Sequence, residues 1–294
     1  MTLFLQLLIN GIINGILYAQ LAVGFGIIWR SHNIFHVVYG SLYVVCAYAF
    51  YVFMTVMQLN FTNAFFLTIT FAALLGWIIE IFFYRPFYQK KASASSVLIA
   101  SLGLFFVLEN LVAMIFGNEI QSISRDLSKT YEVGCIILTE IQLLEFFLGA
   151  ISLTLLWGSV KKIHYIKAIW AMGDQPELIS VIGISPFVLR NLALIISTIM
   201  ASIPACLITY DIGIDPYEGM SYLLISAVAV LFGGTHRYVG WIIGSIVLSI
   251  LQSIVIWQFS ARWMDMVTFS LLVLILMFRP HGIMDFEKRL EEDI

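Results

Sequence analysis

The stretch FLQLLINGIINGILYAQLAVGFGII, residues 4–28, decides the class of fold. A helix needs about 20 predominantly apolar residues to cross the hydrocarbon core of a bilayer, and this stretch is longer and carries no charge. No basic region precedes it, and it is too long for the apolar part of a cleavable signal peptide. We therefore interpret it as a first membrane span.

The rest of the chain continues this pattern. Its 294 residues are 61% hydrophobic and 11% charged, whereas soluble domains are close to half apolar and a quarter charged. Further apolar runs occupy residues 37–57, 62–84, 96–116, 141–160, 187–210, 221–233, 239–257 and 263–279. The run at 221–233 is short and ends at Gly233-Gly234, which predicts a half-helix or re-entrant segment enclosed by protein or water. The sequence predicts an all-α integral membrane protein, a single domain over residues 1–294, with eight to nine transmembrane helices.

Basic residues predict the orientation. They gather in a few short loops and in the tail, at Arg85, Lys90, Lys91, Lys161, Lys162, Lys167, Arg237, Arg279, Lys288 and Arg289. With nine crossings these segments share one side, and short loops rich in Lys and Arg stay in the cytoplasm. We expect the N-terminus outside and the C-terminus inside.

The sequence lacks the motifs that are typical of several kinds of chemistry. The chain has no phosphate-binding loop of the P-loop type, no His-Glu-x-x-His and no Cys-x-x-Cys. Its three cysteines are too scattered for a disulfide framework, and we expect them reduced and packed. His32 and His36 are four residues apart without a third metal ligand, and we expect histidines to lie mostly at span ends. These observations predict no enzyme activity and no metal site.

Few charges fall within the predicted spans, where each costs about 2.5–3.5 kcal/mol at a helix centre. Glu109 is deep in the fourth span and is either structural or part of a solute pathway. Glu80 and Glu145 lie closer to span ends, where we expect them to reach the interface. One buried glutamate gives weak support for proton-coupled transport.

Two segments could form a polar pathway. Asn10 and Asn14 in the first span either bond across a helix contact or line a polar path. The segment from His32 to Ser41 interrupts the apolar pattern, and a broken helix offers backbone groups to a polar solute; the alternative is an ordinary interfacial turn. Similar tetrapeptides at 40–43 (Gly-Ser-Leu-Tyr) and 219–222 (Gly-Met-Ser-Tyr) do not by themselves indicate a repeat.

The loop near 161–187 is the longest polar stretch with a helical pattern. Asp174 is a potential N-cap, Pro176 suits the first turn, and Glu177 stands where a capping box needs it. Gly183 can end a helix in the left-handed conformation. The pattern predicts a short amphipathic helix on the cytoplasmic face, either a surface connector or a docking site for a partner.

Stretches along nearly the whole chain resemble one family, the permease subunits of branched-chain amino-acid (LIV-type) ABC transporters. They are Asn10–Gly24, Glu80 with Tyr84-Arg85-Pro86, Leu98–Leu104, the 168–184 loop, Asp215–Gly219, Val230–Gly234 and Phe278–Ile283. The resemblance implies an inner-membrane importer subunit without cofactors of its own, whose partner ATPases bind ATP and magnesium. It also implies a second permease subunit, two cytoplasmic ATPase subunits and a soluble solute-binding protein.

The resemblance also assigns candidate residues. Gly173, Asp174, Glu177 and Gly183 would shape the contact with the ATPase. Tyr39, Gly40, Ser41 and Tyr43 would lie in the solute region, and Asn10, Asn14, Ser101 and Glu109 complete the candidate pathway.

The family commonly has Asn-Phe-Ala-His-Gly-Glu where this chain has His36-Val-Val-Tyr-Gly-Ser41, so Tyr39 replaces a histidine and Ser41 a glutamate. Loss of that carboxylate is expected to change the affinity for cationic groups. The solute is expected to be a branched-chain or other amino acid. The alternative is a secondary transporter or channel for a small polar solute such as an amide or urea, which would need ion ligands besides Glu109.

Overall fold

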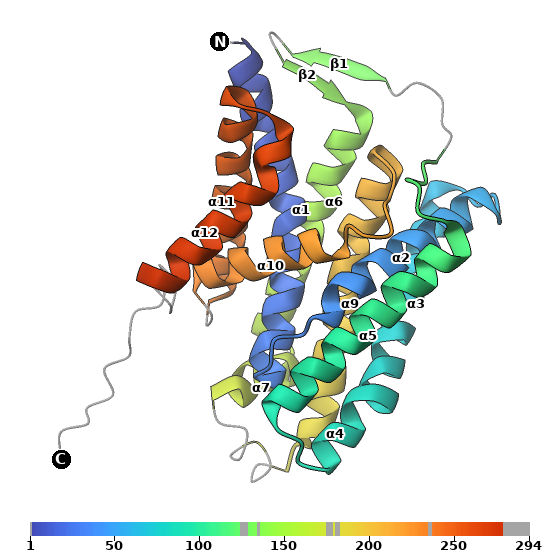
Figure 1. The fold of residues 1–294 in the computed structure, drawn as a ribbon, viewed down its shortest axis with the longest axis vertical. Coiled ribbons are helices and arrows are strands. Elements are labelled where there is room, and N and C mark those ends of the chain that lie inside the picture. The colour runs from blue at the N-terminus through green and yellow to red at the C-terminus, as the bar shows by residue number, and fades with distance from the viewer. Residues whose placement is uncertain are drawn as a thin grey trace.

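The protein is a bundle of long helices (Figure 1). A computed structural model describes residues 2–123, 129–133, 136–174, 179, 183–234 and 237–278. In these ranges, eight helices are long and apolar enough to cross a membrane. The elements are α1 (Thr2–His32), α2 (Val38–Thr55), α3 (Phe61–Ile79), the π-helix η1 (Glu80–Tyr84), α4 (Arg85–Gln89), α5 (Ala94–Phe116), β1 (Thr130–Val133), β2 (Ile136–Thr139), α6 (Glu140–Lys162), α7 (His164–Asp174), α9 (Pro186–Asp211), α10 (Gly219–Gly233), α11 (Tyr238–Gln258), η2 (Ala261–Trp263) and α12 (Met264–Phe278). The predicted all-helical membrane fold is confirmed.

Helix α1 is the central element. From Gly15 to its end at His32 it is almost entirely buried, and it packs most extensively against α11 and α9. Its glycines permit this close approach: a Cβ at Gly15 would lie 3.0 Å from Cα of Ile246, and one at Gly26 would lie 2.8 Å from the ring of Trp241. Small residues are the usual means of bringing membrane helices together. The glycines of the first span therefore serve helix packing.

The short helix α10 lies across α1 rather than beside it (Figure 1). It ends at Gly234, whose φ of 95° allows the chain to turn toward α11. The indole Nε1 of Trp241 donates a hydrogen bond to the carbonyl of Gly234 at 2.9 Å. A backbone carbonyl at a helix break is thus paired within the protein, as the membrane interior requires. The structure agrees with the predicted half-helix at 221–233.

The third span continues beyond its predicted end at residue 84. Helix α3 passes through the π-helix η1 into α4, so the helical segment ends at Gln89. The backbone N–H of Arg85 donates to the carbonyl of Glu80, five residues earlier, which is the wide turn of a π-helix. Pro86 has no N–H to contribute to the helical ladder, and a π-turn accommodates such a gap. The proline therefore alters this helix without ending it.

The two ends of the bundle differ. Helices α4 and α7 lie at one end, and the N-terminus and the β1–β2 hairpin lie at the other (Figure 1). The hairpin was not predicted; Gln6 of α1 holds it by bonding both backbone groups of Ile137, at 2.7 and 2.9 Å. The exposed lysines 90, 91, 161 and 162 belong to the α4 and α7 end. This distribution is consistent with the predicted orientation, which stays a prediction.

Candidate functional site

A polar cavity of about 280 Å³ lies where the N-terminal half of α1 meets the ends of four other helices. Its lining comes from α1, α6, α9, α10, α12 and the residue after α9: Asn10, Ile13, Asn14, Leu17, Tyr18, Gln142, Glu145, Ile208, Asp211, Ile212, Tyr222 and Met264. Two of the predicted pathway residues, Asn10 and Asn14, are among them. Their spacing of four residues places both on one face of α1.

Amides and carboxylates form the polar part of this lining. The Oδ1 of Asn10 accepts from Nε2 of Gln6 at 3.3 Å and from Nε2 of Gln142 at 3.5 Å, which orients its side chain. Gln142 is held in turn by the capping box that begins α6 at Thr139. Among the described residues, this lining includes Glu145 and Asp211 but no Lys, Arg or His. The cavity is therefore suited to a group that carries positive charge and hydrogen-bond donors.

Glu145 corrects one expectation from the sequence. We expected it to be solvated near a span end, but it is only 4% exposed. It lies one and a half turns inside α6, at the point where α1 and α9 enclose the cavity. Hydropathy along one segment cannot reveal this enclosure, because it depends on helices distant in sequence.

The two similar tetrapeptides face each other beside the cavity. A Cβ on Gly219 would lie 2.9 Å from the carbonyl oxygen of Gly40, so the first turns of α2 and α10 touch through their backbones. One turn further on, the rings of Tyr43 and Tyr222 are 4.3 Å apart. Tyr222 lines the cavity, and Tyr43 therefore supports the lining from behind. The sequence similarity was visible, but its meaning depended on the crossing of two helices.

Acidic residues before α10 add to the charge near this crossing. The pKa of Glu218 is raised to about 7, mainly by burial and also by the negative charge of Asp215, while a hydrogen bond from the backbone of Asp215 opposes the rise. At neutral pH this carboxyl is thus only partly ionised. It acts electrostatically on the hydroxyls of Tyr18 and Tyr222, both of which line the cavity.

The other predicted pathway residues are packed elsewhere. The hydroxyl of Tyr39 donates to the carbonyl of Leu21 at 2.9 Å, and that of Ser41 donates to the carbonyl of Val38 at 2.9 Å. On α5, the hydroxyl of Ser101 donates to the carbonyl of Leu98 at 2.7 Å. Glu109 is 8% exposed on the same helix and is not among the residues that line the cavity. Of the predicted pathway residues, the structure brings Asn10 and Asn14 together in the cavity, and Tyr43 contacts the cavity through the ring of Tyr222.

The amphipathic helix predicted between Asp174 and Gly183 falls mostly on residues 175–178 and 180–182, which lie outside the described residues. Asp174 itself is the last residue of α7, a helix before it that was not predicted. The apolar face of α7 accounts for this helix, since Ile166, Ile169 and Met172 recur every three residues and are buried. Glu177 falls outside the described residues. Gly183 has the predicted left-handed backbone, with φ 85°, and the N–H of Ile184 donates across it to the carbonyl of Ile179 at 3.3 Å, a bond typical of a glycine-terminated helix.

Helix α7 is anchored to the C-terminal end of α1. The guanidinium Nε of Arg30 donates to the carbonyl of Trp170 at 3.0 Å, and its Cζ lies 5.9 Å from the centre of the Trp170 ring. A Cβ on Gly173 would lie 2.7 Å from the backbone oxygen of Arg30. The absence of a side chain at Gly173 is therefore what lets α7 approach α1.

We expect Gly173→Ala to push α7 away from α1, because the added methyl group meets backbone that cannot rotate aside. Solute-stimulated ATP hydrolysis by the assembled transporter should fall, while insertion into the membrane is retained. Gly158→Ala on α6 is the matched control, since its Cβ would meet nothing within 4 Å. Equal ATPase stimulation in both variants would contradict a coupling role for this contact.

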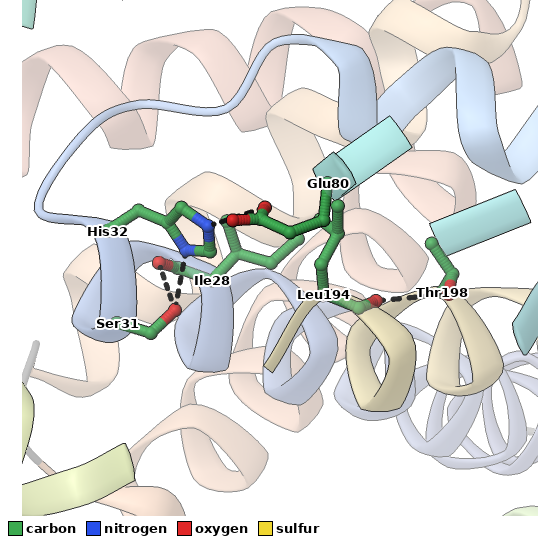
Figure 2. A network of polar contacts seen from close by, with 6 residues as sticks. All are labelled: Ile28, Ser31, His32, Glu80, Leu194 and Thr198. Carbon is green, nitrogen blue, oxygen red and sulfur yellow. Dashed lines mark hydrogen bonds and ion pairs between the residues drawn. The ribbon is translucent and has the colours of Figure 1, made fainter. Parts of the chain in front are cut away.

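A second buried polar cluster lies at the same end of α1 (Figure 2). His32 Nε2 and Glu80 Oε2 are 3.2 Å apart, and both side chains are 0% exposed. The hydroxyl of Ser31 is 2.6 Å from His32 Nδ1. The expectation that Glu80 reaches the interface was therefore wrong, and His32 and His36 are buried rather than interfacial. A helix-end carboxylate can be buried when a basic group from another helix faces it.

Other residues with chemical potential form no further site. Among the described residues no group of three or more His, Cys, Asp or Glu could hold a metal ion. Cys46 and Cys206 are free and buried, as predicted, and Cys135 lies outside the described residues.

Comparisons with known proteins agree with this architecture. The family described as "Branched-chain amino acid transport system / permease component" matches residues 7–276. The "High-affinity branched-chain amino acid transport system permease protein LivH" of Escherichia coli K12 is 24% identical, over 96% of this chain and 95% of its own length. The corresponding protein BraD of Pseudomonas aeruginosa is also 24% identical over 96% of this chain and 95% of its own length.

A solved structure is similar in fold. "PsaBC from Streptococcus pneumoniae in complex with Fab" superposes with a TM-score of 0.52, covers 95% of this chain and 92% of its own, and is 15% identical. At that identity the likeness concerns the fold alone. Because the family match extends over nearly all of the membrane-spanning helices, the chain belongs to the family of permease components of branched-chain amino-acid transport systems and is the membrane-spanning permease subunit of an ABC importer.

Proposed function

We propose that this permease imports a zwitterionic amino acid with an aliphatic side chain, and that the cavity around Asn14 and Glu145 is where the solute enters the subunit. The observation that carries the proposal is the composition of the cavity. It combines carboxylates, amides and phenols with aliphatic walls such as Ile13, Leu17 and Ile208.

Each part of such a solute has a counterpart in this lining. Glu145 and Asp211 can accept hydrogen bonds from an ammonium group, and charge-assisted bonds of this kind are the stronger ones. The amide groups of Asn10, Asn14 and Gln142 can donate to a carboxylate. The aliphatic walls can cover an apolar side chain. A carboxylate at position 41 is then not required for cation recognition, because the cavity supplies its own.

The position of the cavity supports delivery by a soluble binding protein. Its residues lie at the start of α1 and α6 and at the end of α9, which is the end of the bundle that holds the N-terminus. With the N-terminus outside, as the basic loops predict, the cavity faces the compartment from which an importer receives solute. The segment from α7 to Gly183 then faces the cytoplasmic ATPases, which supply the ATP and magnesium chemistry.

Reconstituted uptake tests the proposal. The chain is assembled in proteoliposomes with its ATPase subunits, a second permease subunit and its solute-binding protein, and uptake of leucine, isoleucine and valine is compared with that of lysine, glutamate and urea. We expect ATP-dependent uptake of the aliphatic amino acids. Uptake by the chain alone on an ion gradient without ATP, or a preference for urea, would overturn it.

We expect Glu145→Gln to reduce leucine uptake about tenfold, because it replaces a charge-assisted hydrogen bond worth roughly 1.5–3 kcal/mol by a neutral one. Glu119→Gln, an exposed glutamate before β1, is the matched control. The measurement is the initial rate of ATP-driven uptake at fixed protein density. An uptake rate equal to that of the control would show that Glu145 is not part of the solute pathway.

A further inference from the structure

The C-terminal end of α1 joins three elements through buried polar contacts. Arg30 bonds to the backbone of Trp170 in α7, and two residues later His32 faces Glu80 of the π-helix η1. The same helix carries Asn10 and Asn14 of the cavity at its other end. With a rise of about 1.5 Å per residue, α1 spans roughly 45 Å as one uninterrupted helix.

The hydrogen atoms around His32 can be counted. The hydroxyl of Ser31 has one hydrogen and two possible acceptors, the carbonyl of Ile28 at 3.1 Å and His32 Nδ1 at 2.6 Å. If it donates to Ile28, Nδ1 must carry a proton to satisfy Ser31. If it donates to Nδ1, the proton of the neutral imidazole resides on Nε2. In the first arrangement a neutral ring accepts at Nε2 from a protonated Glu80, or a ring protonated on both nitrogens donates from Nε2 to the carboxylate; in the second, Nε2–H donates to Glu80. In each case one hydrogen lies between Nε2 and Oε2, and the contact fixes the orientation of the ring (Figure 2).

The surroundings of this pair are incompletely satisfied. Within the described residues, buried atoms without a hydrogen-bond partner include Glu80 Oε1, the hydroxyls of Tyr84 and Tyr88, His36 Nε2 and Arg190 Nε. Ring contacts place these groups together: His36 lies 4.6 Å from His32 and 4.4 Å from Tyr84, and Arg190 Cζ lies 3.9 Å from the ring of Tyr88. Four elements meet here, namely α1, the α1–α2 connection, the η1–α4 segment and α9.

Such a cluster is not expected to stabilise the folded protein. A buried polar network with unpaired members is less stable than an apolar core of the same shape, and a buried ion pair is itself weak evidence of stabilisation. The cluster also includes a residue of a π-helix, an irregular form of helix that is rare and frequently found at functional sites. The contact is more readily understood as one that the transport cycle uses.

We propose that the His32–Glu80 pair is a positioning contact that fixes the C-terminal end of α1 to η1, so that α1 conveys the movement of α7 to the solute cavity. This inference rests on the proposed coupling role of the α7 segment. Neither residue touches solute; each acts by holding α1 against α3 while Arg30 holds it against α7.

The test measures solute imported per ATP hydrolysed, in proteoliposomes that contain the full transporter. His32→Gln and Glu80→Gln keep the approximate size of each side chain but remove the imidazole or the charge. We expect each to lower this ratio roughly five-fold or more, in the range of ordinary coupling energies, and the double variant to lower it no further. Glu119→Gln, an exposed glutamate after α5, is the matched control and should leave the ratio unchanged.

A role confined to stability would lower the amount and the thermal midpoint of the protein without altering solute imported per ATP. An unchanged ratio in both single variants, or independent losses that add in the double variant, would overturn the proposal. If the wild-type transporter shows no ATP-driven uptake at all, the proposed function fails instead, and the two failures are thus distinguishable.

If the variants of His32 and Glu80 do not fold, the proposal can still be tested with both residues in place, by measuring distances between spin labels. Spin labels are placed at two exposed positions near the contact, Tyr165 of α7 and Lys90 after α4, and a reference pair joins Tyr165 to Tyr217 at the other end. On trapping the ATP-bound state, we expect the first separation to stay constant while the second changes. Equal changes in both pairs would overturn the proposal.

Discussion

Gly40→Ala is expected to reduce the amount of folded permease in the membrane several-fold, although it adds only one methyl group. A Cβ at Gly40 would collide with the carbonyl of Gly219 and would lie 3.1 Å from Cβ of Leu223. Backbone cannot rotate out of the way, so α2 and α10 would have to separate. Overpacking of this kind costs about 1–3 kcal/mol, and membrane helices that meet through glycine depend on that close approach.

The control is Gly103→Ala on α5, where a Cβ would meet nothing within 4 Å. Alanine is there the better helix former by about 1 kcal/mol, so abundance should be unchanged or higher. The measurement is the fluorescence of a fused reporter in membranes, with the thermal midpoint of the purified protein. If Gly40→Ala accumulated normally but transported nothing, Gly40 would line the pathway instead of packing the crossing.

Asn14→Trp is expected to reduce solute uptake to the background seen without ATP. The side chain of Asn14 faces a cavity of about 280 Å³, and an indole ring there would both fill space and remove an amide. Because Asn14 is largely exposed to this cavity rather than packed in a helix contact, the fold should tolerate the larger ring. Asn14→Leu, which removes the amide with little change in volume, should give an intermediate rate.

Asn110→Trp provides the matched control, since Asn110 is exposed on α5 and its amide bonds only to its own helix, at the carbonyl of Phe106. Uptake and ATP hydrolysis are measured on the same vesicles for all variants. Normal uptake by Asn14→Trp would place the solute path outside this cavity.

Much of the fold could be predicted from the sequence. The spans follow from runs of apolar residues, because crossing a bilayer is a requirement on length and hydropathy that each segment meets alone. The half-helix at α10 followed from a short run and a glycine pair. The third span was underestimated because its apolar run stops at residue 84, whereas the helix continues through a π-helix that accommodates the missing N–H of Pro86.

The candidate site was predicted only in part. Asn10 and Asn14 were recognisable because amides are rare in an apolar span. Glu145 and Glu80 were misplaced because each lies near the end of its own helix, and only neighbouring helices determine whether such an end meets water. Helix α7, which ends at Asp174, was not predicted, because the capping pattern after Asp174 was given more weight than the apolar residues before it.

By itself, the sequence determined that this chain is a membrane protein of about nine apolar segments with the pattern of an importer subunit and no ATP-binding loop. Those properties are local, because hydropathy, glycine content and motifs can be evaluated along a single segment of the sequence. Only the tertiary structure decided that residues 10, 145, 211 and 222 share one cavity, that Gly40 meets Gly219, and that His32 meets Glu80. The physical reason is that burial and pairing of polar groups depend on which helices cross, and that is set by packing among segments far apart in the chain.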